Sequence, residues 1–141
     1  MRLRIITVFV LFLLSSLFFI SAGYSSDKFI DLKYSQLTKE AKKQVDCLAD
    51  NIYYEAGYEP EQGKVAVAFV TLNRLQDPRF PKDICSVVKQ RVKSTCQFSW
   101  FCENKKSVHV EVYEQARAVA LKIYANYEQM RDVTELSLIH I

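Results

Sequence analysis

The chain has 141 residues, half of them hydrophobic and a quarter charged, with a formal net charge of +3. This length predicts one domain, and this composition is typical of a packed globular core and excludes a disordered chain. Only three Gly and three Pro residues are present, which argues against a loop-dominated or all-β fold. Because the sequence has no long basic run, we expect no binding to nucleic acid.

Residues 1–23 are typical of a secretory signal peptide. Arg2 and Arg4 form a basic start, residues 5–20 are apolar apart from one threonine and two serines, and residues 21–23 are the small residues Ser-Ala-Gly. The alternative is that residues 5–20 remain uncleaved as a membrane anchor. Both interpretations place the rest of the chain outside the cytoplasm, in the periplasm, the cell envelope or the extracellular space.

The chain contains four cysteines. An even number in an exported protein favours two disulfides, and three pairings remain open. The alternative is a zinc site built from the last three cysteines and His109, but no C-x2-C spacing is present, so we expect no metal and no cofactor. The candidates for disulfide bonding are Cys47, Cys85, Cys96 and Cys102.

After a polar linker or loosely docked arm at residues 24–40, the sequence predicts a helix from about Thr38 to Ala56. Gly57 follows, and a glycine in this place predicts a left-handed helix end. A second helix is predicted over residues 60–75, because proline with flanking acids is typical of a helix start. The alternative for its apolar run VAVAFVTL is a buried strand. The apolar stripe of the first helix comprises Val45, Leu48, Ala49, Ile52, Tyr53 and Ala56.

The second half of the chain predicts shorter elements and one long helix. Residues 77–83 hold two prolines and predict an extended or turned segment. Asp83 is suited to cap a short helix over residues 84–92, and residues 95–106 predict a loop or a small hairpin. Ser107 is suited to cap a last helix that runs to about Met130. Its expected buried stripe comprises Tyr113, Ala116, Ala120, Ile123, Tyr124 and Tyr127.

Glu55 is an acid in the last turn of the first predicted helix. At about 100° per residue it lies close to Leu48, on the apolar face. In one interpretation it is an ordinary helical glutamate that reaches water or pairs with a basic side chain. In the other it points into a cleft beside Tyr53 and Tyr54, where desolvation raises the pKa of its carboxyl so that it holds a proton near neutral pH. Glycosidic cleavage requires such an acid over the bridging oxygen.

Several spaced motifs give the sequence a family resemblance. They lie within CLADNIYYEAGYEPEQGKVAVAFVTLNRLQDPRFPKDICSVVKQ and CQFSWFCE, and they include Y-x-E-A, L-N-R, F-P, C-x-V-V and C-Q-F-S-W. In this order they resemble the SleB-type cell-wall hydrolases, which are the spore-cortex-lytic enzymes and their Gram-negative relatives. The resemblance covers about residues 45–103.

The resemblance implies a mainly α fold of the lysozyme and transglycosylase type, with a helical lobe and a small β hairpin beside a glycan groove. It implies an enzyme that acts on the glycan strands of peptidoglycan, between N-acetylmuramic acid and N-acetylglucosamine, with Glu55 as the catalytic acid. We expect the chain to be a monomer. The residues it implies for substrate binding are Tyr53, Asn73, Gln97, Phe98, Ser99 and Trp100.

The number of nearby acids favours one mechanism. Glu59 and Glu61 are candidates for a second carboxylate, but both suit the start of a helix, and Asp50 points elsewhere. With one convincing acid, Glu55, we expect a lytic transglycosylase, in which the C6 hydroxyl of muramic acid closes an anhydro ring. The alternatives are a non-catalytic peptidoglycan-binding module of the same fold and a small disulfide-rich envelope protein.

The C-terminal end departs from the family pattern. In the family, a Gly-Ala and aromatic-His segment follows the last helix and helps to complete the groove, whereas residues 136–141 do not match it. We therefore expect an incomplete catalytic domain at residues 41–135, with one wall of the groove missing, and we give His140 no role.

Overall fold

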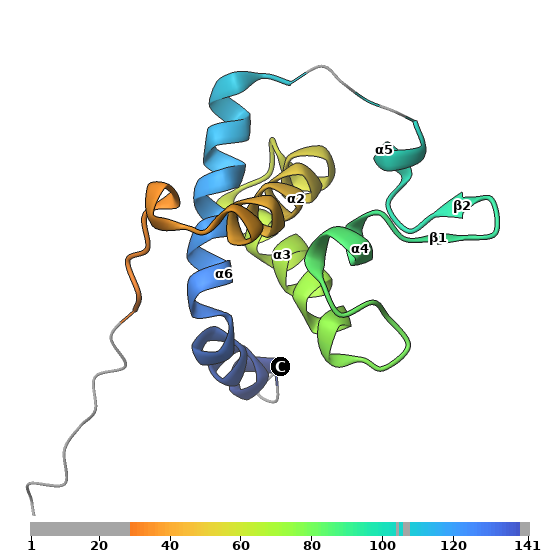
Figure 1. Cartoon of the computed structure of the whole chain (residues 1–141). Coiled ribbons are helices and arrows are strands. Elements are labelled where there is room, and N and C mark those ends of the chain that lie inside the picture. Colours follow the sequence, from red (N-terminus) through yellow and green to blue (C-terminus); the bar gives the residue numbers. More distant parts are fainter. Residues whose placement is uncertain (1–28, 104, 106–107, 139–141) are drawn as a thin grey trace, which may run out of the picture.

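The structure of the chain is a computed structural model that describes residues 29–103, 105 and 108–138 (Figure 1). The predicted signal peptide and the predicted cap Ser107 lie outside these residues. The described elements are η2 (Tyr34–Gln36), α2 (Lys39–Ala56), α3 (Glu61–Gln76), α4 (Ile84–Val88), β1 (Arg91–Val92), β2 (Thr95–Cys96), α5 (Ser99–Cys102) and α6 (Val110–Leu138). A mainly helical fold with a small β hairpin is therefore confirmed.

Helix α2 forms the centre of the molecule. It begins at the predicted position, because the side chain of Thr38 accepts a hydrogen bond from the backbone N–H of Ala41. Its apolar face packs against α3, α4 and α6. Figure 1 shows the long helix α6 on one side of α2 and α4 with the hairpin on the other. Val45, Leu48 and Ile52 are completely buried, so this face of α2 forms the middle of the core.

Gly57 does not end α2 in the predicted left-handed conformation. Its φ is −55° and its ψ −36°, which is right-handed helical geometry. A side chain at this position would collide with the backbone oxygen of Tyr53 and press on Val112 of α6. The glycine is therefore required mainly by the close approach of the Tyr53 carbonyl, with Val112 of α6 as a second contact, rather than by a left-handed turn.

The apolar run after Pro60 is a helix, as predicted, and not a strand. Helix α3 starts at Glu61, directly after Pro60 as its N-cap residue. Ala68 and Leu72 are buried in the core that α3 shares with α2, and Val65 and Phe69 pack against that core. A helix with this many β-branched residues is stable here because tertiary burial outweighs their weak intrinsic preference for strands.

The helix α4 begins as predicted but ends early. The side chain of Asp83 accepts a hydrogen bond from the N–H of Ser86 at 2.9 Å. The helix ends at Val88, four residues before the predicted end, because Arg91 and Val92 pair with Cys96 and Thr95 as a hairpin. Residues 99–102, predicted as loop or hairpin, form the single turn of α5.

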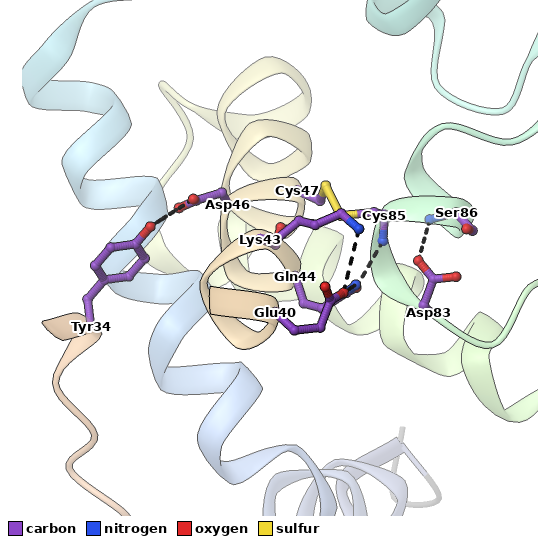
Figure 2. The surroundings of a disulfide bond; sticks show 9 residues. All are labelled: Tyr34, Glu40, Lys43, Gln44, Asp46, Cys47, Asp83, Cys85 and Ser86. Carbon is purple, nitrogen blue, oxygen red and sulfur yellow. Dashed lines mark hydrogen bonds and ion pairs between the residues drawn. A yellow bond between two sulfur atoms is a disulfide. The ribbon is translucent and has the colours of Figure 1, made fainter. Parts of the chain in front are cut away.

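The two predicted disulfides are confirmed, and the structure resolves their pairing. Cys47 of α2 bonds to Cys85 of α4, while Cys96 of β2 bonds to Cys102 of α5. Gln44 supports the first disulfide by accepting a hydrogen bond from the N–H of Cys85 at 3.1 Å (Figure 2). With all four cysteines paired, no thiolate is left for the zinc alternative.

The arm before α2 is docked at two points. The hydroxyl of Tyr34 donates to both carboxylate oxygens of Asp46, at 2.8 and 2.7 Å, and the guanidinium of Arg117 lies over the Tyr34 ring. Further out, the side chain of Asn126 bonds to both backbone groups of Ile30, at 2.6 and 3.0 Å. In the described part of the chain, no helix is long and apolar enough to cross a membrane.

Candidate active site

A surface pocket of about 450 Å³ opens at the C-terminal end of α2. It is formed by the last turn of the helix, the loop that leads to α3, and one lysine from the segment before α6. The residues that line it are Tyr53, Tyr54, Glu55, Ala56, Gly57, Tyr58, Glu59 and Lys105. The pocket thus combines two carboxylates, three phenols and one ammonium group.

Glu55 lies in this pocket, but the prediction that it is buried on the apolar face is wrong. Its side chain is exposed, whereas Ile52 and Ala56 on either side of it are buried. The helical period gives the direction in which a side chain leaves the helix axis. It does not say whether another element reaches far enough along the axis to cover it. At the last turn of α2 no described element covers this direction, so the carboxylate faces the pocket and solvent.

Tyr53 and Tyr54 fix the segment that follows α5. The hydroxyl of Tyr54 donates to the backbone oxygen of Lys105 at 2.9 Å, and the hydroxyl of Tyr53 accepts from the backbone N–H of His109 at 2.8 Å. The two rings meet edge to face with centroids 4.9 Å apart. These contacts hold Lys105 at the mouth of the pocket, beside Glu55.

Trp100 lies beneath the pocket and not on its surface. Its ring stacks on Tyr54 with centroids 4.6 Å apart, and only 7% of the residue is exposed. Its indole N–H donates to Asn51 at 3.0 Å, and Asn51 donates in turn to the hydroxyl of Thr71 at 3.0 Å. This buried network links α5, α2 and α3, so Trp100 supports the tyrosine that lines the pocket.

The other residues predicted to bind substrate do not line the pocket. Phe98 is buried in the core with the guanidinium of Arg74 over its ring at 5.0 Å. Gln97 is exposed between β2 and α5, and Ser99 is exposed as the first residue of α5. Asn73 lies on α3 and accepts a hydrogen bond from the hydroxyl of Tyr127 at 2.7 Å. Of the predicted substrate residues, the structure brings Tyr53 alone together with Glu55 in this pocket.

Three residues that line the pocket are not among those predicted to bind substrate, namely Tyr58, Glu59 and Lys105. Tyr58 is 81% exposed beside Glu55, and its phenol offers a flat face for stacking on a sugar ring. Glu59 lines the same pocket as Glu55, whereas Glu61 turns away and pairs with Lys122 at 3.1 Å. The Y-x-E-A motif pointed to the right turn of α2, but nothing in the sequence indicates the loop contacts that bring in Lys105.

Lys105 shapes the electrostatics of the pocket. Its ammonium lies 2.8 Å from Glu103, and this hydrogen-bonded ion pair raises the pKa of the lysine. The negative charge of Glu55 raises the same pKa further. The mouth of the pocket therefore carries a charged hydrogen-bond donor beside the Glu55 carboxylate. Within the described residues, no cluster of His, Cys, Asp and Glu is arranged to hold a metal ion.

The open pocket thus presents a carboxylate beside exposed aromatic faces and a charged hydrogen-bond donor on a mainly helical domain. The model of the cell wall hydrolase family matches residues 58–139, which is more than half of the chain, so the chain belongs to that family. The matched segment begins three residues after Glu55 and includes Tyr58, Glu59 and Lys105.

Two curated proteins show similarity to shorter stretches. The spore cortex-lytic enzyme of Bacillus subtilis (strain 168) is 42% identical over 48 residues, which is 34% of this chain and 16% of that protein. The spore cortex-lytic enzyme of Halalkalibacterium halodurans is 46% identical over 44 residues, 31% of this chain and 13% of that protein. The matches therefore span less than a fifth of each relative. No solved structure matches the chain.

Proposed function

We propose that this chain cleaves the glycan strand of peptidoglycan outside the cytoplasm, between N-acetylmuramic acid and N-acetylglucosamine. The observation that carries the proposal is the placement of Glu55 in a pocket with Tyr53, Tyr54 and Tyr58. Membership of the cell wall hydrolase family supports the class of substrate. The names of the two relatives agree with a cell-wall role, and the two disulfides suit an exported protein.

Glu55 is proposed as the general acid. Its carboxyl donates a proton to the bridging oxygen while the C1–O bond breaks, and positive charge develops at C1 of the muramic acid ring. The exposed ring of Tyr58 is suited to stack on a sugar face next to the acid. The ammonium of Lys105 provides a hydrogen-bond donor at the mouth of the pocket that contains Glu55.

The second step distinguishes two mechanisms. With Glu55 as the sole acid, its carboxylate takes the proton from the muramic acid C6 hydroxyl, and the C6 oxygen attacks C1 to form an anhydro ring. With Glu59 as a second carboxylate, a water molecule attacks C1 and a reducing end forms. We favour the first, because Glu59 directly precedes Pro60, the N-cap residue of α3, where the helix dipole already favours an acid. Its presence in the pocket keeps the second testable.

The proposal predicts that Glu55→Gln abolishes glycan cleavage. The amide cannot donate an acidic proton, so release of soluble fragments from isolated cell walls should fall by about 10² to 10⁴-fold. Because Glu55 is exposed, the free energy of unfolding should change by less than about 0.5 kcal/mol. Mass spectrometry of the wild-type products then separates anhydro ends, expected here, from reducing ends.

The matched control is Glu40→Gln, which makes the same change at the other end of α2, where Glu40 has only surface contacts with Lys43 and Gln44. It should cleave like the wild-type chain. Unchanged cleavage by Glu55→Gln would overturn the assignment of the acid. A wild-type chain that sediments with peptidoglycan but releases nothing would instead identify a non-catalytic binding module.

A further inference from the structure

Lys64 occupies an unusual environment for a lysine. It lies in the first turns of α3 and is only 6% exposed. Among the described residues, it is the one ionisable side chain with so little exposure. Lysine normally keeps its ammonium in water, and burying the charge costs several kcal/mol unless the group finds fixed partners. The hydrogen-bond partner of this ammonium therefore indicates which part of the structure the buried lysine stabilises.

The buried ammonium of Lys64 donates to the backbone oxygen of Glu59, in the loop between α2 and α3. The backbone N–H of Lys64 also bonds to the oxygen of Pro60 at 3.3 Å. The neighbouring residue Gly63 restrains the same glutamate from another side. A Cβ at Gly63 would lie 2.9 Å from the Cβ of Glu59, so the stem of Glu59 packs directly on the glycine.

Glu59 separates two hollows on the surface. One is the pocket that contains Glu55, and the other, of about 500 Å³, lies between the start of α3 and α6. Lys64 lines the second hollow and not the Glu55 pocket, so it contacts Glu59 from the side of the second hollow. Gly63 and Lys64 of α3 thus restrain the side-chain stem and the backbone of Glu59. Glu59 in turn forms part of the wall of the candidate active site.

We propose that Lys64 is a positioning residue, which holds Glu59 and the loop around it in the arrangement that the Glu55 pocket requires. This inference rests on the proposed function for its effect on cleavage, but the restraint on the loop is a separate property of the structure. Lys64 touches no substrate in this proposal and acts only through Glu59.

The test compares Lys64→Met with Lys122→Met. Methionine keeps most of the apolar stem and removes the ammonium, and Lys122 is an exposed lysine of the same hollow that pairs with Glu61. Amide hydrogen exchange, read by mass spectrometry, should become faster at residues 57–63 in Lys64→Met and remain unchanged in Lys122→Met. Unchanged exchange in Lys64→Met would overturn the proposal, and this readout does not depend on catalysis.

Kinetics on soluble glycan fragments then separate positioning from general stability. We expect kcat of Lys64→Met to fall about tenfold with little change in KM, since a small displacement within an active site lowers the rate of the chemical step. A parallel urea titration gives the folded fraction, and Lys64→Arg serves as a second variant that retains a charged donor and should recover part of kcat.

A double-mutant comparison identifies the route of the effect. If Lys64 affects cleavage by placing the side chain of Glu59, Lys64→Met should cause little further loss of kcat in a Glu59→Ala background, which keeps the backbone oxygen that Lys64 binds but lacks the carboxylate that it places. The same fold-loss in both backgrounds, or a loss that follows only the folded fraction, would contradict the proposal. If the wild-type chain does not cleave glycan, only the proposed function is contradicted. The hydrogen-exchange measurement still tests whether Lys64 restrains the loop, because it does not depend on cleavage.

Discussion

The middle of α2 and its last turn lie on one continuous helix but differ in almost every physical respect. In the middle, Leu48 and Ile52 are completely buried, Cys47 is bonded to α4, and Asn51 is hydrogen-bonded to two other elements. In the last turn, Glu55 is exposed and lines a pocket. The helix therefore carries the centre of the core and the candidate acid within two turns of each other.

This difference shows how a small domain can hold an exposed acid in a fixed place. The buried middle fixes the position of the helix axis. Tyr53 and Tyr54, one turn further on, hydrogen-bond to the segment before α6 and so fix that side of the pocket as well. The acid itself needs no contact in the core. Changes in the middle of α2 should therefore lower the stability of the fold, and should lower activity only where they reach the pocket through Trp100 and Tyr54, whereas changes at Glu55 should alter activity alone.

The largest stability effect in this comparison is expected for Cys47→Ala with Cys85→Ala. The disulfide closes a sequence separation of 38 residues, and its removal gives the unfolded chain additional freedom worth about 4 kcal/mol. Urea titration of the oxidised wild-type and variant chains measures the loss. Cleavage per folded molecule should change little, because this disulfide lies at the N-terminal half of α2, away from the pocket residues.

The other disulfide provides the matched control. Cys96 and Cys102 are only six residues apart, so the same entropic argument gives about 2 kcal/mol for their joint replacement by alanine. An equal or larger loss for this local pair would show that the middle of α2 is not the part of the fold most dependent on a covalent bond.

Much of the fold follows from local signals. The apolar period of α2, its start near Thr38, and the start of α3 after Pro60 were each predicted within about one residue, because they depend on neighbours in sequence. The presence of two disulfides was also predictable. Their pairing was not, since the contact of Cys47 with Cys85 depends on how α4 returns to α2.

The candidate site was only partly predictable for the same reason. The motif around Glu55 indicated the right turn of the helix, but its exposure depends on where α6 and the segment before it lie. Trp100 was predicted at the substrate, whereas its indole N–H is directed into the core toward Asn51. Lys64 gave no signal at all, because a lysine in a predicted helix is normally exposed and its carbonyl partner can be identified only in three dimensions.

An intermediate effect is expected for Asn51→Ala, which breaks the buried network in the middle of α2. The change leaves the indole N–H of Trp100 without its acceptor in a site that water does not reach, and we expect a loss of about 2 kcal/mol in the free energy of unfolding. Activity should fall as well, since Trp100 supports Tyr54 in the pocket. Urea titration and cell-wall cleavage measure the two effects.

The control for this network is the same substitution in a Trp100→Phe background. Phenylalanine has no N–H to leave unsatisfied, so Asn51→Ala should cost clearly less there than in the wild-type chain. Equal losses in both backgrounds would show that the hydrogen bond to Trp100 is not the reason for the effect.

The smallest effect is expected for Asp50→Asn, a carboxylate in the middle of α2 that hydrogen-bonds Tyr113 of α6. Burial raises the pKa of Asp50, although its hydrogen bond with Tyr113 and the nearby Lys89 act against the rise, and the charge of Asp46 adds to it. An aspartate with a raised pKa in the folded state destabilises the fold once the pH exceeds its unfolded pKa, and this cost is absent below that pH.

Asparagine keeps an acceptor for Tyr113 without the charge, so Asp50→Asn should match the wild-type chain near pH 3 and become more stable as the pH rises to 7. The gain should stay below about 1 kcal/mol, the size of one net hydrogen bond. Urea titrations at a series of pH values measure it. A variant that loses stability at neutral pH would show that the ionised carboxylate holds α6 through Tyr113, and that this bond outweighs the cost of burying the charge.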